Sequence, residues 1–406
     1  MEVAIIGGGA AGFFAAIAVK ENHPNATVTI FEKSQQVLSK VKISGGGRCN
    51  VTNGCTKISE LCSAYPRGGK KLKKLFGAFG TADTLEWFEK RGVPLVIQDD
   101  NCVFPASQDS QSIIDCFLRQ TKRLNITIKT GMGVKSLTPA GEKLKLFFGD
   151  GQMTQSFDKV IVATGGSPKK EGLRWIEELN HVIEPPVPSL FTFNMPTEKV
   201  RELMGIVVEN VRVAIQGTKI KATGPLLVTH WGMSGPAILK LSSFGARVLS
   251  EMNYNFKVQV CWADEANHEE VTNTLTQIAA ENPKKQVANT RPYELPERLW
   301  LFLLSKADIA PEKRWSELGK KGLNRLTEIL TNDIYEAKGK STFREEFVTC
   351  GGVSLESVNM NTMESKVCKN LYLAGEVLDI DAITGGYNLQ AAWTTGFVAG
   401  KLISSS

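Results

Sequence analysis

The chain has 406 residues, of which 42% are apolar and 22% charged, and its formal net charge is +6. This length exceeds the roughly 100–200 residues of an ordinary domain, so we expect a large domain with an insertion or a second domain. No apolar run approaches the roughly 18–20 residues of a membrane helix, which argues against a membrane protein and predicts a soluble one.

The N-terminus enters a strand-like run at residues 3–6 without a basic leader or a small-residue cleavage site. We therefore expect neither a signal nor a transit peptide, and a cytoplasmic protein. The eight cysteines form no Cys-x-x-Cys pair and are too sparse for a disulfide scaffold, so reduced thiols are expected.

Positive charge gathers near the N-terminus. Residues 1–80 hold eleven Lys or Arg against four Glu, with a cluster at Arg67, Lys70, Lys71, Lys73 and Lys74. A solvated helix face is the ordinary interpretation. A surface for nucleic acid or for an anionic cofactor is the alternative, and composition does not separate the two.

The first thirty-two residues predict a β-α-β unit. A buried strand at 3–6 leads through a glycine loop into a helix at 10–20, and β-branched residues at 26–31 form the next strand, with Glu32 at its end. Gly7, Gly9 and Gly12 precede Glu32 in the spacing of a dinucleotide site. The backbone then approaches a pyrophosphate and the carboxylate meets ribose hydroxyls. A purely structural glycine turn is the alternative.

In the middle of the first domain, the sequence predicts a basic, glycine-rich stretch at 39–54 and three helices at 70–79, 82–91 and 110–123. It then predicts short antiparallel strands within 126–157, with a turn at Gly149-Asp150-Gly151, and a buried strand at 159–163 before Thr164-Gly165-Gly166.

Prolines at 185, 186 and 188 favour an extended backbone and mark a crossover into an inserted segment. Residues 190–262 read as strand-rich and 266–331 as largely helical. Buried strands return at 347–352 and 370–375, followed by a small-residue helix at 390–402. The insertion is therefore expected at 189–345, with both chain ends in one domain.

Two further glycine motifs suit a ligand. The run Ser44-Gly45-Gly46-Gly47-Arg48-Cys49-Asn50-Val51-Thr52-Asn53 leaves backbone bare, and Lys40, Lys42 and Arg48 add positive charge, which suits a phosphate or an electron-rich ring. A flexible loop is the alternative. Near the C-terminus, a strand ends at Gly375-Glu376, and Gly385-Gly386-Tyr387-Asn388 opens a helix. A carboxylate and a helix N-terminus at this point suit a flavin.

These residues resemble the bacterial BaiN-like NAD(P)/FAD-dependent oxidoreductases, a branch of the glutathione-reductase-like flavoprotein superfamily. The resemblance spans nearly the whole chain. Besides the three glycine motifs above, it rests on the segments 103–105, 163–166, 229–236, 348–353, 362–366 and 375–390. The chain departs from the family at Ala382, where glycine is usual, and at 167–171, where the family has a longer glycine- and serine-rich segment. The second departure could alter access to the flavin.

The resemblance implies FAD bound non-covalently by a three-layer, Rossmann-like α/β domain (1–188 and 346–406). It also implies an insert domain (189–345) made of a β-barrel part (189–262) and a mainly helical part (263–345). The cofactor-binding candidates are Gly7, Gly9, Ala10, Ala11, Gly12, Glu32, Lys33, Lys40, Ser44, Gly45, Gly46, Gly47, Arg48, Cys49, Asn50, Thr164, Gly165, Gly375, Glu376, Asp379, Gly385, Gly386, Tyr387, Asn388 and Leu389. No metal site is expected.

Four other residues are weaker candidates. His230 could move the proton that accompanies hydride transfer, although a structural role is equally consistent with its position. Cys49 and Cys350 fall in segments expected near the flavin but lack a Cys-x-x-Cys partner. His181 is interpreted as structural.

The expected activity is hydride transfer through flavin N5 between an NAD(P)H-type donor and a small organic substrate, by enone reduction or by amine or ketone oxidation. Gly131-Met132-Gly133 lacks a third glycine, so any nicotinamide is expected to dock transiently. The alternatives are a flavoprotein that acts on RNA, as in tRNA modification, and a non-catalytic redox sensor. No membrane partner is expected.

Overall fold

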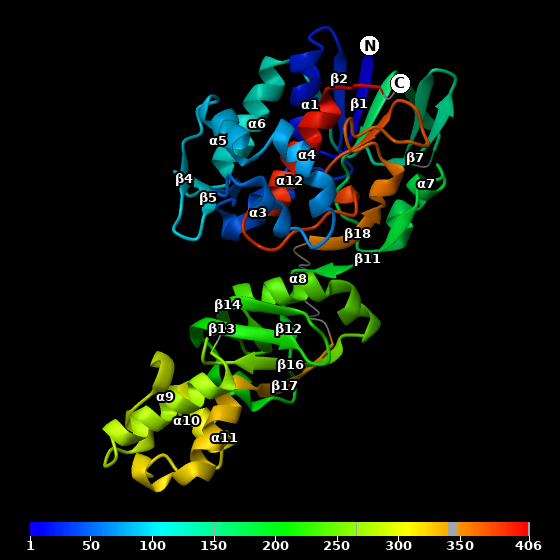
Figure 1. The fold of residues 1–406 in the computed structure, drawn as a ribbon. Helices are drawn as coiled ribbons and strands as arrows, with labels where there is room; N and C mark the ends of the chain where they lie inside the picture. The colour runs from blue at the N-terminus through cyan, green and yellow to red at the C-terminus, as the bar shows by residue number, and fades with distance from the viewer. Residues whose placement is uncertain (150, 265, 340–347, 405–406) are drawn as a thin grey trace. The chain divides into compact units, whose positions relative to one another are not determined.

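The computed structural model describes residues 1–149, 151–264, 266–339 and 348–404. The chain divides into two compact units, Met1–Val187 with Val348–Ser406, and Pro188–Phe347. The first unit therefore contains both chain ends, as the blue and red ribbons show (Figure 1). Each unit is described by itself below.

A five-stranded parallel sheet forms the centre of the first unit, in the order β19-β10-β1-β2-β6. Its strands are Glu2–Ile6 (β1), Thr27–Phe31 (β2), Thr127–Lys129 (β6), Lys159–Val162 (β10) and Leu371–Leu373 (β19). The apolar runs predicted at 3–6 and 159–163 are buried in it, as a sheet covered on both faces requires. Residues 127–129 belong to this parallel sheet, which corrects the antiparallel assignment of that part of 126–157.

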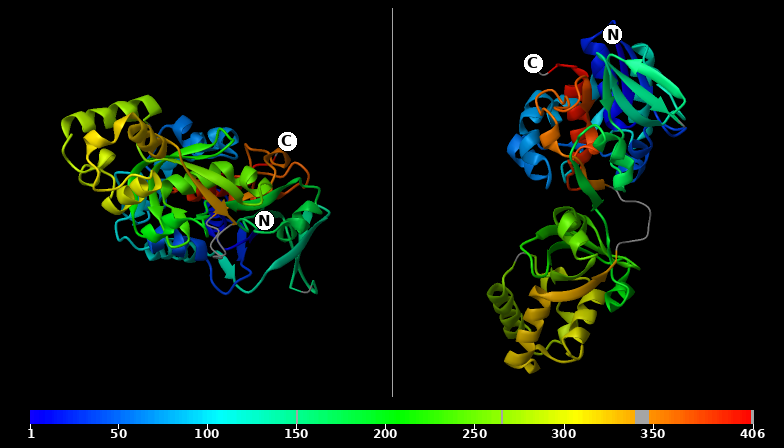
Figure 2. Two further views of the ribbon diagram at one scale, coloured as in Figure 1. Left: turned by 90° about the horizontal axis from the view of Figure 1, so that it is seen from below. Right: turned by 90° about the vertical axis from the view of Figure 1, so that its right-hand side faces the viewer.

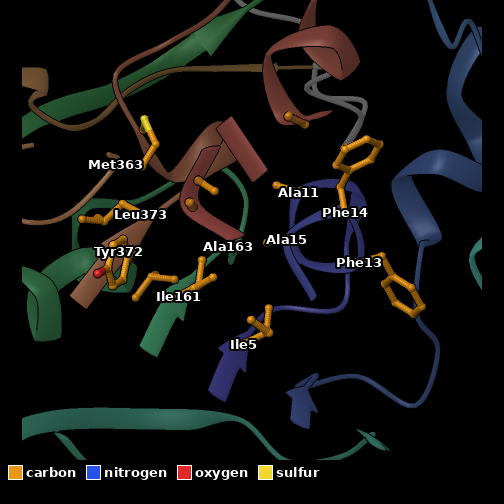
Figure 3. Close-up of a cluster of buried hydrophobic side chains, with 14 of the residues drawn as sticks. Ile5, Ala11, Phe13, Phe14, Ala15, Ile161, Ala163, Met363, Tyr372 and Leu373 are labelled. Atoms are coloured by element: carbon orange, nitrogen blue, oxygen red, sulfur yellow. The ribbon is translucent and has the colours of Figure 1, made fainter. Parts of the chain in front are cut away.

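One face of the sheet is covered by helices α1 (Ala10–Asn22), α12 (Tyr387–Gly400) and α6 (Gln111–Arg123). Small residues let α1 and α12 approach closely, since a Cβ added at Gly396 would lie 2.8 Å from the Ala11 carbonyl oxygen. Phe14 of α1 packs near Trp393 of α12, with ring centroids 5.6 Å apart. Figure 3 shows Phe13, Phe14 and the small side chains of α1 in this core. The two ends of the chain therefore share one helix interface.

A three-stranded antiparallel sheet covers the other face and completes three layers (Figure 2). It consists of Val134–Ala140 (β7), Lys143–Phe148 (β8) and Met153–Phe157 (β9). Phe31 of β2 contacts Phe148 and Phe157 at centroid distances of 4.8 and 5.7 Å, which joins this sheet to the parallel one. The turn between β8 and β9 includes Asp150, which lies outside the described residues.

Shorter elements surround this core. They are the helices Ser39–Ile43 (α2), Ile58–Ser63 (α3), Gly69–Ala78 (α4), Thr81–Glu89 (α5) and Arg174–Glu177 (α7), the sheet of Thr52–Asn53 (β3), Cys102–Pro105 (β5) and Leu95–Ile97 (β4), and the paired strands Ile183–Ser189 (β11) and Val348–Val353 (β18). The helices predicted at 70–79, 82–91 and 110–123 match α4, α5 and α6.

The second unit contains a six-stranded antiparallel, barrel-like sheet in the order β12-β15-β14-β13-β16-β17. Its strands are Phe193–Asn194 (β12), Val207–Ile215 (β13), Lys221–Val228 (β14), Gly232–Ser234 (β15), Asn255–Cys261 (β16) and Asp333–Lys338 (β17). The side-chain amide of Asn194 donates to the Lys338 carbonyl at 3.0 Å, which links the two end strands. The sixteen-residue helix α8 (Pro236–Glu251) interrupts the segment that we expected to be strand-rich.

Helices α9 (His268–Glu281), α10 (Glu297–Lys306) and α11 (Gly319–Thr331) form the helical part of this unit (Figure 1). The chain then returns to the sheet through β17, so the helical segment ends before residue 333 rather than at 345. Buried Asp333 joins the two parts, because it accepts hydrogen bonds from Trp262 at 2.9 Å and from Tyr335, and pairs with Lys306. Among the described residues, no helix is both long and apolar enough to cross a membrane.

Candidate functional site

The first glycine loop follows β1, and its glycines are of two kinds: some lie against other parts of the main chain, and one faces open space. Gly7 has φ +113°, and a Cβ there would lie 2.3 Å from the Ala163 carbonyl oxygen. A Cβ at Gly12 would lie 2.0 Å from the Gly7 carbonyl oxygen. A Cβ at Gly9 would meet no atom within 4 Å. Gly7 and Gly12 are therefore required by the fold, whereas Gly9 leaves open space at the N-terminus of α1.

Glu32 lies directly beneath this loop at the end of β2. Its carboxylate accepts hydrogen bonds from the Gly8 main-chain N–H at 2.8 Å and from the Ser34 N–H and hydroxyl at 2.9 and 2.6 Å. Burial raises the pKa of Glu32, but the hydrogen bonds from Ser34 and Gly8 outweigh burial and leave the pKa below its ordinary value. The side chain is therefore an ionised hydrogen-bond acceptor at neutral pH.

A cavity of about 590 Å³ adjoins Glu32. Its walls come from the end of β1, from residues after β2, from 132–135 and from the segment that follows β10. The lining residues include Gly7, Glu32, Lys33, Gly133, Thr164, Gly165, Ser167, Glu171 and Trp175. Ser167, Pro168 and Glu171, from the segment where the chain departs from its family, also line the cavity. An effect of this departure on how substrate or a nicotinamide reaches the flavin stays a prediction.

The second glycine loop forms a tight turn at Ser44–Gly47. Gly45, Gly46 and Gly47 have φ values of +57°, +68° and +86°, which favour glycine. A Cβ at Gly46 or Gly47 would meet nothing within 4 Å, whereas one at Gly45 would lie 2.7 Å from the Asn50 nitrogen. This turn consequently presents bare backbone on its outer side, as a flat or anionic ligand requires.

The three cations beside this turn have different neighbours. The Arg48 guanidinium stacks on the Phe104 ring at 4.1 Å, and the Lys42 ammonium donates to Gln111 at 2.8 Å. The Lys40 ammonium pairs with Glu376 at 2.7 Å. Lys40 alone of the three thus connects this loop to the C-terminal motif.

Glu376 is the point where several motifs from distant parts of the chain meet. Besides Lys40, it accepts the Thr349 main-chain N–H at 2.9 Å. A Cβ at Gly166 would lie 2.8 Å from its carboxylate, and one at neighbouring Gly375 would lie 2.7 Å from the Ala11 Cβ. The predicted residues of the first loop, the second loop and the C-terminal motif are therefore neighbours.

The Gly385-Gly386 turn is held against the second loop. Gly385 and Gly386 have φ values of +126° and +85°, and a Cβ at Gly386 would lie 2.3 Å from the Thr52 carbonyl oxygen. The Asn53 amide donates to the Gly385 carbonyl at 3.1 Å. Helix α12 begins immediately afterwards, so its free N–H groups lie beside this turn.

Asn388 fixes the loop before this turn. Its side chain accepts from the Ala382 N–H at 2.9 Å and donates to the Ala382 carbonyl at 3.1 Å. The Tyr65 hydroxyl donates to the Tyr387 carbonyl at 2.6 Å. Both the oxygen and the nitrogen of the Asn388 side-chain amide, which we predicted to contact the cofactor, thus form hydrogen bonds with the main chain. Ala382 itself is buried.

Sequence reasoning missed how the loop is anchored by Tyr65 and by an ion pair between Arg67 and Asp381. The only local signal was the basic cluster that contains Arg67. Lys71 of the same cluster pairs with Glu356 at 2.9 Å. The cluster therefore combines a structural cation with an exposed face and is not a uniform strip.

The weaker candidates have distinct environments. Cys49 is buried, and burial raises the pKa of its thiol to about 12, while Cys350 is buried in β18. His181 is buried between the Ile176 carbonyl and the Ser365 hydroxyl, at 3.1 and 2.8 Å, which fits the structural role expected for it. His230 lies exposed between β14 and β15 in the second unit, so its proposed proton transfer stays a prediction.

The other predicted contacts flank these turns. Asp379 donates its main-chain N–H to the Val353 carbonyl at 2.9 Å, between β18 and the Gly385 turn. Ala10 and Ala11 lie in the first turn of α1, and Leu389 in that of α12. Direct contact of any of these residues with a cofactor is a prediction.

The parallel sheet, the open glycine loop with its ionised Glu32 and the two glycine turns together define a Rossmann-type flavoprotein oxidoreductase. The chain belongs to the HI0933-like family, because the model of the HI0933-like protein Rossmann domain matches residues 1–402. This match confirms the family resemblance and the fold class.

Two relatives match over nearly their full length. The chain is 28% identical to the 3-dehydro-bile acid delta(4,6)-reductase of Clostridium scindens, over 98% of both chains. It is 26% identical to the ribosomal RNA dihydrouridine synthase of Escherichia coli, over 98% of this chain and 97% of the relative. Each is an enzyme with a different substrate.

Solved structures share the fold at low sequence identity. The 3-ketosteroid delta1-dehydrogenase of Sterolibacterium denitrificans matches with a TM-score of 0.55 at 10% identity, over 98% of both chains. Escherichia coli quinol fumarate reductase FrdA matches with a TM-score of 0.51 at 15% identity, over 99% of this chain and 69% of that one. These likenesses concern the fold alone.

Proposed function

We propose that the protein is an FAD-dependent reductase of a carbon-carbon double bond that is conjugated to a carbonyl group. The observation that carries the proposal is the contact of Lys40 with Glu376 and of Asn53 with the Gly385-Gly386 turn, which brings the segments flanking the Ser44–Gly47 turn to the C-terminal motif in the unit that also holds the Gly9 loop. Open space at Gly9, Gly46 and Gly47 fits a long, partly flat dinucleotide.

Each part of the site has a role that its chemistry supports. Glu32 accepts hydrogen bonds from ribose hydroxyls, and the N-terminus of α1 faces the pyrophosphate charge. Lys40 and Glu376 would hold the polar chain between pyrophosphate and ring, and the N-terminus of α12 would stabilise negative charge on the ring. Bound FAD supplies hydride transfer at N5.

The names of the relatives favour reduction over amine or ketone oxidation. A 3-dehydro steroid with delta(4,6) double bonds and the uracil ring both carry a carbon-carbon double bond conjugated to a carbonyl. In the proposed reaction of a simple enone, hydride would add to the carbon β to the carbonyl and a proton from solvent would add to the α carbon. We infer that a nicotinamide donor loses the hydride and is oxidised.

RNA is the second candidate substrate, in place of a small enone. Two relatives, from Escherichia coli and Haemophilus influenzae, are named ribosomal RNA dihydrouridine synthases, and both are covered over at least 97% of their length. The chemistry at the flavin is the same, so the two candidates differ in what surrounds the double bond.

The test is anaerobic reduction followed by reoxidation. We expect yellow protein whose flavin absorption is bleached by NADH or NADPH, and recovery of the yellow colour on adding an enone or a uracil-containing RNA. Mass spectrometry then finds the substrate two mass units heavier. Colourless protein that FAD does not reconstitute, or bleached protein that neither substrate class reoxidises, would refute the proposal.

A further inference from the structure

Two segments of the helical part of the second unit are held together by main-chain hydrogen bonds. The Trp315 N–H donates to the Lys285 carbonyl at 3.1 Å, and the Val287 N–H donates to the Lys313 carbonyl at 2.8 Å. Gln286 and Arg314 form an antiparallel bridge between these bonds. The loop at 283–285 therefore lies beside residues 313–315, and helix α11 follows these residues directly.

These segments are rich in cations. Residues 283–285 and 313–325 contain seven basic side chains and one acidic one, Glu317, whose carboxylate accepts the Arg314 main-chain N–H at 3.1 Å. We call the seven cations the insert basic surface: Lys284, Lys285, Lys313, Arg314, Lys320, Lys321 and Arg325. All are exposed except Lys313, which is half-buried.

Most of these charges have no carboxylate partner. Within the described parts of the chain, Arg325 pairs with Asp308 at 3.4 Å, and no ion pair reaches Lys284, Lys285, Arg314, Lys320 or Lys321. By contrast, Arg67 and Lys71 of the N-terminal basic cluster are both paired. The insert basic surface therefore has more charge available to an external anion than the N-terminal cluster.

The position of two lysines is unfavourable for the helix that carries them. Lys320 and Lys321 lie in the first turn of α11, and this first turn contains no acidic residue. Cations near a helix N-terminus oppose the helix dipole and therefore destabilise the helix slightly. Their contribution to the fold is therefore unfavourable, whereas they attract an anion that approaches this face.

The surroundings favour RNA over a membrane as the anion. A membrane-binding surface combines basic residues with exposed large apolar side chains. Among the described residues, the exposed large apolar side chains all lie outside residues 266–339. The described part of this segment therefore offers no such side chain for insertion among lipids. A strip of hydrated lysine and arginine side chains instead matches the regularly charged phosphate backbone of a nucleic acid.

We propose that the insert basic surface binds the phosphate backbone of an RNA substrate. This inference rests on the RNA form of the proposed function, and it deepens that proposal by assigning recognition to the inserted unit. Phosphate contacts position the RNA without reading its sequence, so selection of a particular uracil belongs to the flavin-binding unit.

The test measures binding of a fluorescein-labelled stem-loop RNA by anisotropy between 50 and 200 mM salt, the range over which phosphate contacts change affinity strongly. The test variant is Lys284→Gln, Lys285→Gln, Lys320→Gln and Lys321→Gln together. The matched control removes four exposed lysines of the first unit, by Lys70→Gln, Lys73→Gln, Lys74→Gln and Lys122→Gln. A variant with the first four lysines changed to arginine checks that charge matters.

We expect the test variant to bind RNA at least about tenfold more weakly and to lower the salt slope by about three, whereas the control changes affinity less than about threefold. The arginine variant binds normally. Equal weakening in both glutamine variants, unchanged binding in the test variant, or tighter binding to vesicles containing phosphatidylserine than to RNA would overturn the proposal. Circular dichroism checks folding, and the pairs Lys284/Lys285 and Lys320/Lys321 are also changed separately.

Nicotinamide-dependent bleaching of the flavin separates this proposal from the proposed function. Both glutamine variants should bleach like the natural protein, because none of the changed lysines is among the residues that hold the glycine turns in the described structure. If RNA binding weakens when the insert basic surface is changed but the flavin never bleaches with a nicotinamide, the surface is still assigned to RNA. The reductase proposal is then refuted.

Discussion

Arg67 and Asp381 form a buried ion pair although 314 residues separate them in the chain. The Asp381 side chain is fully buried, and that of Arg67 is 12% exposed. Their main chains also form an antiparallel bridge. The pair therefore fixes the loop before the Gly385-Gly386 turn to the segment that precedes α4.

Breaking this pair should destabilise the protein strongly. Arg67→Ala removes the cationic partner of a fully buried carboxylate, so we expect a loss of about 3–5 kcal/mol in the free energy of unfolding, measured in urea. The exposed pair of Lys57 and Glu60 is the control, and Lys57→Ala should leave the free energy of unfolding nearly unchanged. Similar losses in the two variants would show that Asp381 does not depend on Arg67.

Gly9 and Gly12 should respond differently to alanine. At Gly9 the new Cβ meets open space, so Gly9→Ala should fold normally but retain FAD at least about tenfold more weakly, and Gly9→Val should abolish retention. At Gly12 the Cβ would lie 2.0 Å from a carbonyl oxygen, so Gly12→Ala should lower the melting temperature. Thermal melts and flavin content give both answers. A Gly9→Val protein that purifies with FAD would contradict the loop assignment.

Glu32 should make stability depend on acid pH. Because its folded pKa lies below the ordinary value, its contribution is complete above the ordinary pKa of 4.5 and is lost as the pH falls through the folded pKa. Glu32→Gln should therefore flatten the acid side of the stability profile of the apoprotein, and it should weaken FAD binding at pH 7. Urea unfolding at a series of pH values measures the first effect, and an unchanged profile would speak against it.

His181 should also reduce stability as the pH falls, but in a higher range. Burial lowers its folded pKa, although the hydrogen bond with the Ile176 carbonyl acts in the opposite direction. The unfolded chain therefore takes up a proton below about pH 6.5 that the folded state resists. Unfolding free energies at pH 8 and 5.5 should differ less in His181→Gln than in the natural protein. Exposed His268→Gln is the control and should keep the full difference.

Cys49 should be inert in the native protein. A thiol whose pKa is about 12 is protonated at pH 8, and its burial blocks reagents, so iodoacetamide should leave Cys49 unmodified until the protein unfolds. Peptide mass spectrometry locates the labelled cysteines, with partly exposed Cys55 as the internal control. Cys49→Ala should still bleach with a nicotinamide. A native disulfide that contains Cys49 would restore a redox role.

The sequence alone predicted the local parts of the flavin-binding unit. Gly7, Gly9, Gly12 and Glu32 belong to one β-α-β unit, whose period, turn chemistry and spacing act over about thirty residues. The sequence also predicted the bare backbone at Gly46 and Gly47, because glycine has no side chain, although it left a flexible loop open as the alternative. Helix α8 was missed because a helix packed against a sheet presents apolar runs that resemble those of buried strands.

Only the tertiary structure decided which distant residues meet. The sequence near Asp381 does not indicate that Asp381 pairs with Arg67. Likewise, the sequence near Ala382 does not indicate that the Asn388 side-chain amide binds both the N–H and the carbonyl of Ala382. The same is true of Lys40 with Glu376, and of the two segments that form the insert basic surface. Motifs record short-range constraints on the backbone. Ion pairs and hydrogen bonds between distant segments arise only when packing brings their side chains together, so they leave no periodic signal in the sequence.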